Sequence, residues 1–495
     1  MKIETIQLRF KALGEFIEAN WPVFIFTVLC LLGIFFHECW RDELQALLIA
    51  KAPLSLSQLL GDALKYEGHP ALWYLLLKVF SPFGVQPLGM QLLNAFLMIG
   101  AVSIFWWHFP LERKLKSLLV FNYYFIFEFG LIARSYTLGI FLTFYYLAFC
   151  DSKGKGLRLS AYFALLLMMH TSIYTWILAL GILAYRIWGQ GRLSRNQSFY
   201  EAAFGLFFAL LALLQMLPAS DSSFADKMTA HFDFDQLLSV FYLVGEVFLP
   251  VLALTRFPNL WSQILPFPNA VIIFRFCFFA FLMGIFAYRL SKRDKSLAFV
   301  YSASCLLLLC FSYFRFVGSL RHMAHLLLMW AAFYGLSAKK QTWTLSKETQ
   351  NIIYVFAFLS AANGATLYFL DVIFPFSDAK KASQVISPTD KLVVAIPDYI
   401  GASVSGYLNG KSLFYSEGKR WGTFTRWDKK RLDLATFEKP LGNMLHDQGG
   451  GEAIIVTNQN EVADKVRAKM KSITLYQSEA CIVPDECYVV LKVRE

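Results

Sequence analysis

The chain has 495 residues, of which 57% are hydrophobic and 16% are charged, and its mean hydropathy is +0.48. Charges this sparse cannot cover a soluble protein of this size, so the composition indicates a polytopic membrane protein. The net charge of +11 does not indicate nucleic-acid binding. The positive excess lies in short clusters between apolar segments, whereas the chain after Asp371 is nearly neutral.

The apolar segments predict about eleven transmembrane helices. We expect them at about 21–37, 88–109, 117–132, 137–150, 158–170, 172–187, 199–217, 270–290, 297–314, 323–337 and 351–370. Five basic clusters are expected on the cytoplasmic side by the positive-inside rule: 113–116, 153–158, 186–195, 292–295 and 339–347. With a cytoplasmic N-terminus and an uncleaved first helix, this order fixes the side of every loop.

Two long regions between these helices are predicted to be external. The first runs from His37 to about 87 and contains the apolar piece 70–83, which is too short to span comfortably. We expect that piece to be re-entrant or interfacial, because a crossing there would place the cluster 113–116 outside. The second external region, 219–269, contains the apolar segment 237–254, which must also fold back if both neighbouring helices are placed correctly.

The composition changes after residue 370, which predicts a transmembrane domain over 1–370 and a soluble α/β domain over 371–495. The stretch from Asp390 to Tyr415 reads as strand, turn, helix and strand. EAIIVTN, a helical EVADKVRAKMK and CYVVLKV follow. This domain is expected outside the membrane, and Cys481 and Cys487 could form a disulfide there if the compartment is oxidising. The spacing of the two cysteines leaves that pairing open.

The predicted topology places polar side chains from distant parts of the chain on the same external side. They are Asp42, Glu43, Glu67, His69, Arg134, Tyr136, His170, Arg315, Arg321, His322 and His325. Ionisable groups at a membrane boundary are costly to hold and commonly functional. We therefore predict an active site at this boundary.

The acidic residues supply candidates for proton transfer. Asp42 and Glu43 are the predicted catalytic pair, since a carboxylate there could take a proton from an acceptor hydroxyl or amine. Glu67 and His69 are predicted to line the same cavity. Asp42, Glu67 and His69 also form a ligand set that suits zinc or manganese, so a divalent metal ion is a possible cofactor. The alternative is that these are solvated helix ends and a loop before a helix.

The basic residues supply candidates for binding a phosphate. Arg134 lies between two apolar segments, where its guanidinium needs an anion and suits a phosphate. Arg321 and His322 could bind the same phosphate or assist a leaving group, and His325 shares a helical face with His322. The alternatives are an interfacial anchor for Arg134 and structural roles for the histidines. Tyr136 and His325 are expected to line the cavity.

Four short segments resemble the GT-C membrane glycosyltransferases. They are RDELQALLIAKAPL after the first helix, EGHPALWYLLL, ARSYTLG and, more weakly, SLRHMAHLLL. Their order and predicted side are more specific than any one of them, and the resemblance covers about 1–340. Within the superfamily the chain looks most like the branch of aminoarabinose transferases and protein O-mannosyltransferases. It departs from that branch in His-Pro-Ala, where many relatives have a second proline, and in Arg-His-Met-Ala-His, where Arg-Tyr is common.

The resemblance implies a transferase that takes a sugar from a polyprenyl phosphate donor. Asp42 would be the catalytic base or orient the acceptor, and Glu43 would complete the acidic pair. Arg134 and Arg321 would bind the donor phosphate, and His69 would line the cavity. The acceptor would be a lipid, a glycan or a protein. The implied location is a bacterial inner membrane, with the active site and C-terminal domain facing the periplasm.

Two other functions are compatible with charged residues in a membrane protein. A transporter or flippase of lipid-linked sugars would also place charges along its path. The charges here gather at one face and no inverted repeat is visible, which favours the transferase. A non-enzymatic assembly or lipid-binding protein, which would use the α/β domain for docking, is the second alternative.

Overall fold

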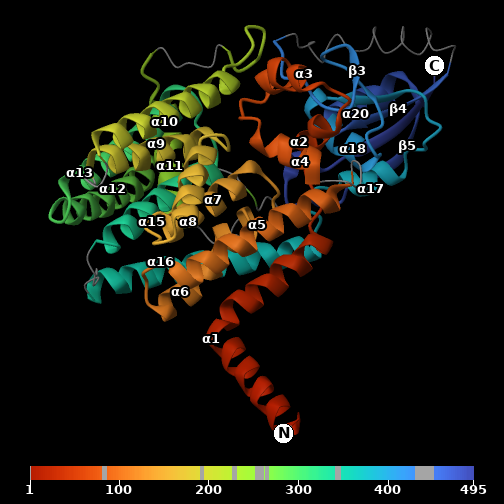
Figure 1. The fold of residues 1–495 in the computed structure, drawn as a ribbon. Coiled ribbons are helices and arrows are strands. Elements are labelled where there is room, and N and C mark those ends of the chain that lie inside the picture. Colours follow the sequence, from red (N-terminus) through yellow and green to blue (C-terminus); the bar gives the residue numbers. More distant parts are fainter. Residues whose placement is uncertain are drawn as a thin grey trace.

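A computed structural model gives the architecture of the chain (Figure 1). It describes residues 2–80, 86–189, 194–225, 231–250, 261, 267–340, 347–429 and 451–494, and only the backbone of residues 2–13 and 16. Helices make up most of the described chain as far as residue 373, and a six-stranded sheet follows. This confirms the predicted class of fold, an α-helical membrane domain followed by an α/β domain.

Six helices of the described chain are long and apolar enough to cross a membrane, as judged by length and composition. They are α1 (Lys2–Phe36, apolar from Ile17), α5 (Pro87–His108), α10 (Arg195–Met216), α12 (Asn269–Ser291), α13 (Lys295–Phe314) and α16 (Lys347–Ile373). Shorter apolar helices are α7 (Ser135–Phe149) and α9 (Ile173–Ala184), which the π-turn η3 (Tyr185–Gly189) extends. Together with α8 (Lys155–Met168) and α15 (His325–Ala338), these helices lie in segments that the sequence predicts to cross the membrane. The number of eleven transmembrane crossings stays a prediction.

The single helix predicted over 117–132 is wrong. The chain forms α6 (Arg113–Val120), turns at Asn122 and continues in the π-helical turn η2 (Tyr124–Glu128). The side-chain oxygen of Asn122 accepts hydrogen bonds from the backbone N–H groups of Tyr124 (2.8 Å) and Phe125 (3.1 Å). Such local side-chain bonds compete with helix formation. The break leaves Arg134 extended before α7, where its side chain can reach other loops.

The loop after α1 forms a small helical layer beside the sheet domain (Figure 1). Its elements are α2 (Arg41–Lys51), α3 (Leu56–Gly61), η1 (Ala63–Tyr66) and α4 (Leu72–Phe80). With nine residues, α4 is much shorter than the ~20 residues that a span needs, in agreement with the predicted fold-back. Residues 81–83 of that predicted segment lie outside the described part of the chain.

The second predicted fold-back corresponds to α11 (Phe234–Phe248), which packs against α12. Its fifteen residues are also fewer than a span needs. Residues 251–254 of the predicted segment are not among those described. After α13, the short helix α14 (Leu320–Met323) leads into α15.

The sheet has the order β3-β2-β1-β4-β6-β5. Its strands are β1 (Val393–Ile396), β2 (Leu413–Tyr415), β3 (Arg420–Gly422), β4 (Glu452–Thr457), β5 (Lys471–Gln477) and β6 (Val489–Arg494). The helical elements around it are α17 (Ala379–Gln384), η5 (Asp398–Ile400), α18 (Gly401–Tyr407), α20 (Asn460–Lys469) and η7 (Pro484–Glu486). β1 is parallel to β2 and β4, and the other pairs are antiparallel. The sequence did not predict β3 and β5, whose residues are mostly not buried.

The sheet domain packs directly on the loop that follows α1. α18 lies against α2, and a side chain at Gly406 would place its Cβ 2.9 Å from the Leu44 side chain. The close approach therefore requires a glycine at this position. As a result, residues before 70 and after 390 meet around a single cavity.

Candidate active site

A cavity of about 340 Å³ lies between the loop after α1, the start of α7, the segment before α15 and the sheet domain. Seven of the predicted site residues line it: Asp42, Glu67, His69, Arg134, Tyr136, Arg321 and His322. The sheet domain contributes Tyr399, Ala402, Thr425 and Trp427 to the wall. The structure thus brings together residues as far apart in the chain as Arg41 and Trp427.

The Asp42 carboxylate lies between two arginines. Its Oδ2 is 3.2 Å from Nη1 of Arg134 and 3.3 Å from Nη2 of Arg321. Arg134 Nη1 also donates to the Asp42 carbonyl oxygen at 2.7 Å. Burial raises the pKa of the Asp42 carboxyl, but the surrounding guanidinium groups outweigh burial and hold the pKa below its usual range. Asp42 is therefore ionised at neutral pH.

Arg321 is held by aromatic rings and keeps free donor groups. Its guanidinium carbon lies 5.1 Å from the ring centroid of Trp40 and 5.3 Å from that of Trp261. Both distances are within the range of a cation–π contact. Nε and Nη1 of Arg321 are buried and have no hydrogen-bond acceptor among the described residues. Buried guanidinium donors that lack acceptors suit an anionic ligand that brings its own oxygens.

The turn at Gly68 presents Glu67 and His69 to the cavity. Gly68 has a φ of +68°, which favours glycine. The His69 Nε2 lies 3.3 Å from Arg134 Nη2, and burial followed by the charge of Arg134 lowers the pKa of His69 to about 3. His69 is therefore neutral and can accept from the guanidinium.

Glu67 is connected to the sheet domain through hydrogen bonds of Gln45. Its Oε1 accepts from Gln45 Nε2 at 2.8 Å, and Gln45 Oε1 accepts from the backbone N–H of Thr425 at 2.9 Å. Burial raises the pKa of Glu67 to about 7, although Gln45 and Arg134 oppose that rise. Gln45 thus ties the wall of the cavity to the domain that covers it.

His322 is held in one tautomer. The backbone N–H of Ser319 donates to its Nδ1 at 2.7 Å, so the proton of the neutral ring lies on Nε2, which donates to the Tyr136 hydroxyl at 2.8 Å. Burial, then the positive charge of Arg321, lowers the pKa of His322 below its usual value. His322 is therefore neutral, and its single N–H holds the Tyr136 hydroxyl in place.

Two predicted site residues do not line the cavity. The Glu43 side chain is fully buried and its Oε1 accepts from the backbone N–H of Ala133 at 2.6 Å. Neighbouring residues of a helix point about 100° apart, so Asp42 faces the cavity and Glu43 faces the interior. His325 donates from Nδ1 to the His322 carbonyl oxygen at 3.0 Å and stacks on Tyr174. Its side chain is buried.

Glu43 instead forms a buried cluster with His37 and Asp371. His37 Nδ1 is 2.8 Å from Asp371 Oδ2, and its Nε2 is 3.2 Å from Glu43 Oε2. Burial lowers the pKa of His37, but the two carboxylates outweigh burial and raise it to about 10. The protonated His37 thus joins the end of α1, the start of α2 and the end of α16 behind the Asp42 cavity.

The predicted metal ligands do not form a recognisable metal site. No group of three or more His, Cys, Asp or Glu side chains with the spacing of a metal site occurs in the described ranges. Asp42 lies against two guanidinium groups, which would compete with a cation for its oxygens. The divalent ion stays a prediction.

Sequence reasoning missed the residues that hold the site together. Trp40 lies two residues before the predicted acidic pair, and this closeness in sequence could have indicated its role. Trp261 and Asp371 are distant in sequence, and nothing local indicates that they meet Arg321 and His37. Arg41 was not among the predicted site residues, whereas the structure places it on the cavity wall.

The fold combines a helical domain with membrane-spanning helices and an α/β domain that covers the cavity, and solved structures share this fold. They are two crystal structures of ArnT from Cupriavidus metallidurans. The structure bound to undecaprenyl phosphate aligns with a TM-score of 0.53 at 12% identity, over 95% of this chain and 97% of that chain. The apo structure aligns with a TM-score of 0.54 at 12% identity, over 97% and 98%. No protein-family model and no curated protein matches the sequence.

Proposed function

We propose that this protein is a glycosyltransferase that moves a sugar from a polyprenyl phosphate donor to an extracytoplasmic acceptor, with inversion at the anomeric carbon. The proposal rests on one observation. Arg321 lines the cavity, and its buried Nε and Nη1 have no hydrogen-bond acceptor among the described residues. A phosphate oxygen suits these donors. The ArnT structure bound to undecaprenyl phosphate supports a lipid phosphate as the ligand.

The charge of the cavity also favours an anion. Arg134, Arg315 and Arg321 line it against the carboxyl groups of Asp42 and Glu67, and the fourth lining arginine, Arg41, is paired with Asp485 and Glu486. His69 and His322 are neutral, so they do not add to this excess. A positive excess within low-dielectric walls attracts and orients a phosphate head group.

The proposed reaction divides the work between the carboxylate and the arginines. An acceptor hydroxyl or amine attacks the anomeric carbon, the bond from that carbon to the phosphate oxygen breaks, and polyprenyl phosphate leaves. Arg134 and Arg321 bind the phosphate and stabilise the negative charge that develops on it. Asp42, ionised in the free protein, orients the acceptor and takes its proton once the phosphate has drawn the arginines away. His322 fixes the Tyr136 hydroxyl, whose own O–H can donate to the sugar phosphate.

The proposed location follows from the lipid donor and from the basic clusters. A polyprenyl chain partitions into the bilayer and presents its sugar phosphate at the interface, where this cavity would lie. The positive-inside rule places the cavity and the α/β domain on the periplasmic side of a bacterial inner membrane. The acceptor proposed there is a lipid, a glycan or a protein.

A turnover assay with purified protein tests the proposal. A polyprenyl phosphate sugar should release polyprenyl phosphate only when an acceptor is present. Asp42→Asn should lower kcat by about 10²- to 10⁴-fold, the usual contribution of a general base, whereas Asp464→Asn, at an exposed position of the sheet domain, should not. Full activity of Asp42→Asn would remove the proposed role of the carboxylate. Movement of the intact donor between leaflets without turnover would favour a flippase.

A further inference from the structure

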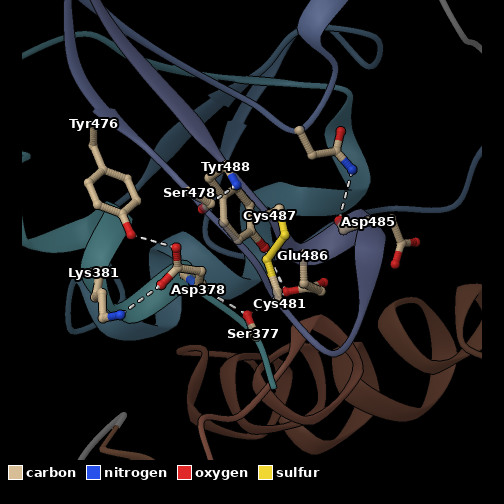
Figure 2. Close-up of a disulfide and its surroundings, with 12 residues drawn as sticks. Ser377, Asp378, Lys381, Tyr476, Ser478, Cys481, Asp485, Glu486, Cys487 and Tyr488 are labelled. Atoms are coloured by element: carbon tan, nitrogen blue, oxygen red, sulfur yellow. Dashed lines mark hydrogen bonds and ion pairs between the residues drawn. A yellow bond between two sulfur atoms is a disulfide. The ribbon is translucent and has the colours of Figure 1, made fainter. Parts of the chain in front are cut away.

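The disulfide loop of the sheet domain is inserted into the membrane domain. Cys481 and Cys487 are bonded and close a short loop beside the helices of the chain's start (Figure 2). The backbone N–H groups of Ile482 and Val483 donate to the carbonyl oxygens of Pro375 and Phe376, at 3.0 and 3.2 Å. Both side chains are buried in the core formed by the membrane helices. The loop is thus anchored to the segment that follows α16.

The same loop holds Arg41, the residue next to Asp42. Nη1 of Arg41 lies 2.5 Å from Asp485 Oδ2 and 3.7 Å from Glu486 Oε1. The backbone N–H of Arg41, the first residue of α2, donates to Glu486 Oε1 at 3.4 Å. The loop therefore contacts both the side chain and the backbone at the start of this helix.

Glu486 itself is rigidly held. Its side chain is fully buried, and its Oε2 accepts from the hydroxyl groups of Ser377 (2.7 Å), Ser403 (3.0 Å) and Tyr488 (2.6 Å). Figure 2 shows Glu486 beside the disulfide, near Ser377 and Tyr488. A carboxylate with this many fixed donors defines the position of its remaining oxygen, which faces Arg41.

The Arg41 guanidinium has little freedom to move. Its carbon lies 4.8 Å from the ring centroid of Tyr399 and 5.2 Å from that of Trp40. Trp40 is also one of the two rings that contact Arg321. Because Asp42 is the next residue, a shift of Arg41 would move the backbone of Asp42.

We propose that Asp485 and Glu486, fixed by the Cys481–Cys487 disulfide, are positioning residues that hold Arg41 and thereby set the orientation of Asp42 in the cavity. The sheet domain is then part of the catalytic site, and opening the disulfide releases the start of α2. The expected change in kcat rests on the proposed transferase function. The expected loosening of the start of α2 does not depend on any reaction.

A double-mutant cycle tests the kinetic consequence. Arg41→Gln and Asp485→Asn should each lower kcat about 10-fold with less than a 2-fold change in donor affinity, because the donor phosphate contacts other arginines. The double variant should be no worse than the poorer single variant, and Asp485→Glu should restore most of kcat. Additive losses in the double variant, or unchanged kcat in Arg41→Gln, would overturn the proposal.

Hydrogen–deuterium exchange tests the structural consequence without any turnover. In Cys481→Ala/Cys487→Ala, peptides covering residues 41–51 should exchange about 10-fold faster than in the wild type, while peptides from β1 and β4 are unchanged. If the double cysteine variant does not fold, the half-exposed Asp485→Asn variant should show the same local change. Asp464→Asn is the matched control. Unchanged exchange over 41–51 overturns the proposal, whereas faster exchange in a protein without transferase activity overturns the proposed function alone.

Discussion

Arg321→Lys separates the positive charge of Arg321 from its planar geometry. Lysine keeps the charge that pairs with Asp42 but loses the fork of donors and the flat group that contacts Trp40 and Trp261. If the unfilled Nε and Nη1 bind the donor phosphate, a single ammonium cannot replace both. The substitution should therefore weaken donor binding while leaving the fold intact.

The expected size of the effect follows from the contacts of Arg321. Loss of one hydrogen bond to a charged group costs about 1.5–3 kcal/mol. The contacts with the two tryptophan rings add about 0.5–1 kcal/mol each. Because each 1.4 kcal/mol is tenfold in affinity, one lost phosphate bond alone corresponds to about 10- to 100-fold weaker binding. Solvent screening lowers this loss of binding free energy only slightly, because the Arg321 side chain is only 10% exposed.

The assay is titration of the detergent-solubilised protein with a polyprenyl phosphate, which needs no acceptor and no turnover. Arg467→Lys, at an exposed position in α20, is the matched control and should bind as the wild type does. Arg134→Lys should be weakened by a similar factor. Wild-type affinity in Arg321→Lys would refute the argument that the unfilled donors form the phosphate site.

Three other outcomes are expected. His37 is protonated between two carboxylates with its pKa raised to about 10, so its stabilisation is complete below its unfolded pKa of about 6.5 and is lost as the pH rises through 10. The Tm difference between the wild type and His37→Gln should therefore shrink across that interval, and a constant difference would contradict the assignment. Gly68→Ala should cost about 1–2 kcal/mol of unfolding free energy, because Gly68 has a positive φ. A Cβ would meet no atom within 4 Å at Gly68 or at Gly61, so Gly61→Ala is the control and should not lower the unfolding free energy. Equal effects of the two substitutions would exclude backbone strain at Gly68. If a divalent ion binds at Asp42, a chelator should abolish turnover and added metal should restore it. Turnover that is unchanged by the chelator would contradict the predicted metal ion.

The sequence by itself determined the class of protein and the kind of chemistry. Apolar length and the position of basic clusters are local properties, so the membrane helices and the change of composition near residue 370 could be recognised directly. Arginine and aspartate at a membrane boundary are costly, so Asp42, Arg134 and Arg321 could be selected by residue type and predicted position. The structure brings these three within hydrogen-bonding distance.

The tertiary structure decided which neighbours face the cavity and what holds them there. Asp42 and Glu43 are equivalent in sequence, but the starting point and packing of α2 direct one to the arginines and the other to His37. Trp261 and Asp485 reach the site only through the fold, because such contacts depend on packing between segments hundreds of residues apart. No local pattern encodes that packing, so the sequence identified the reactive groups and the fold alone fixed their arrangement.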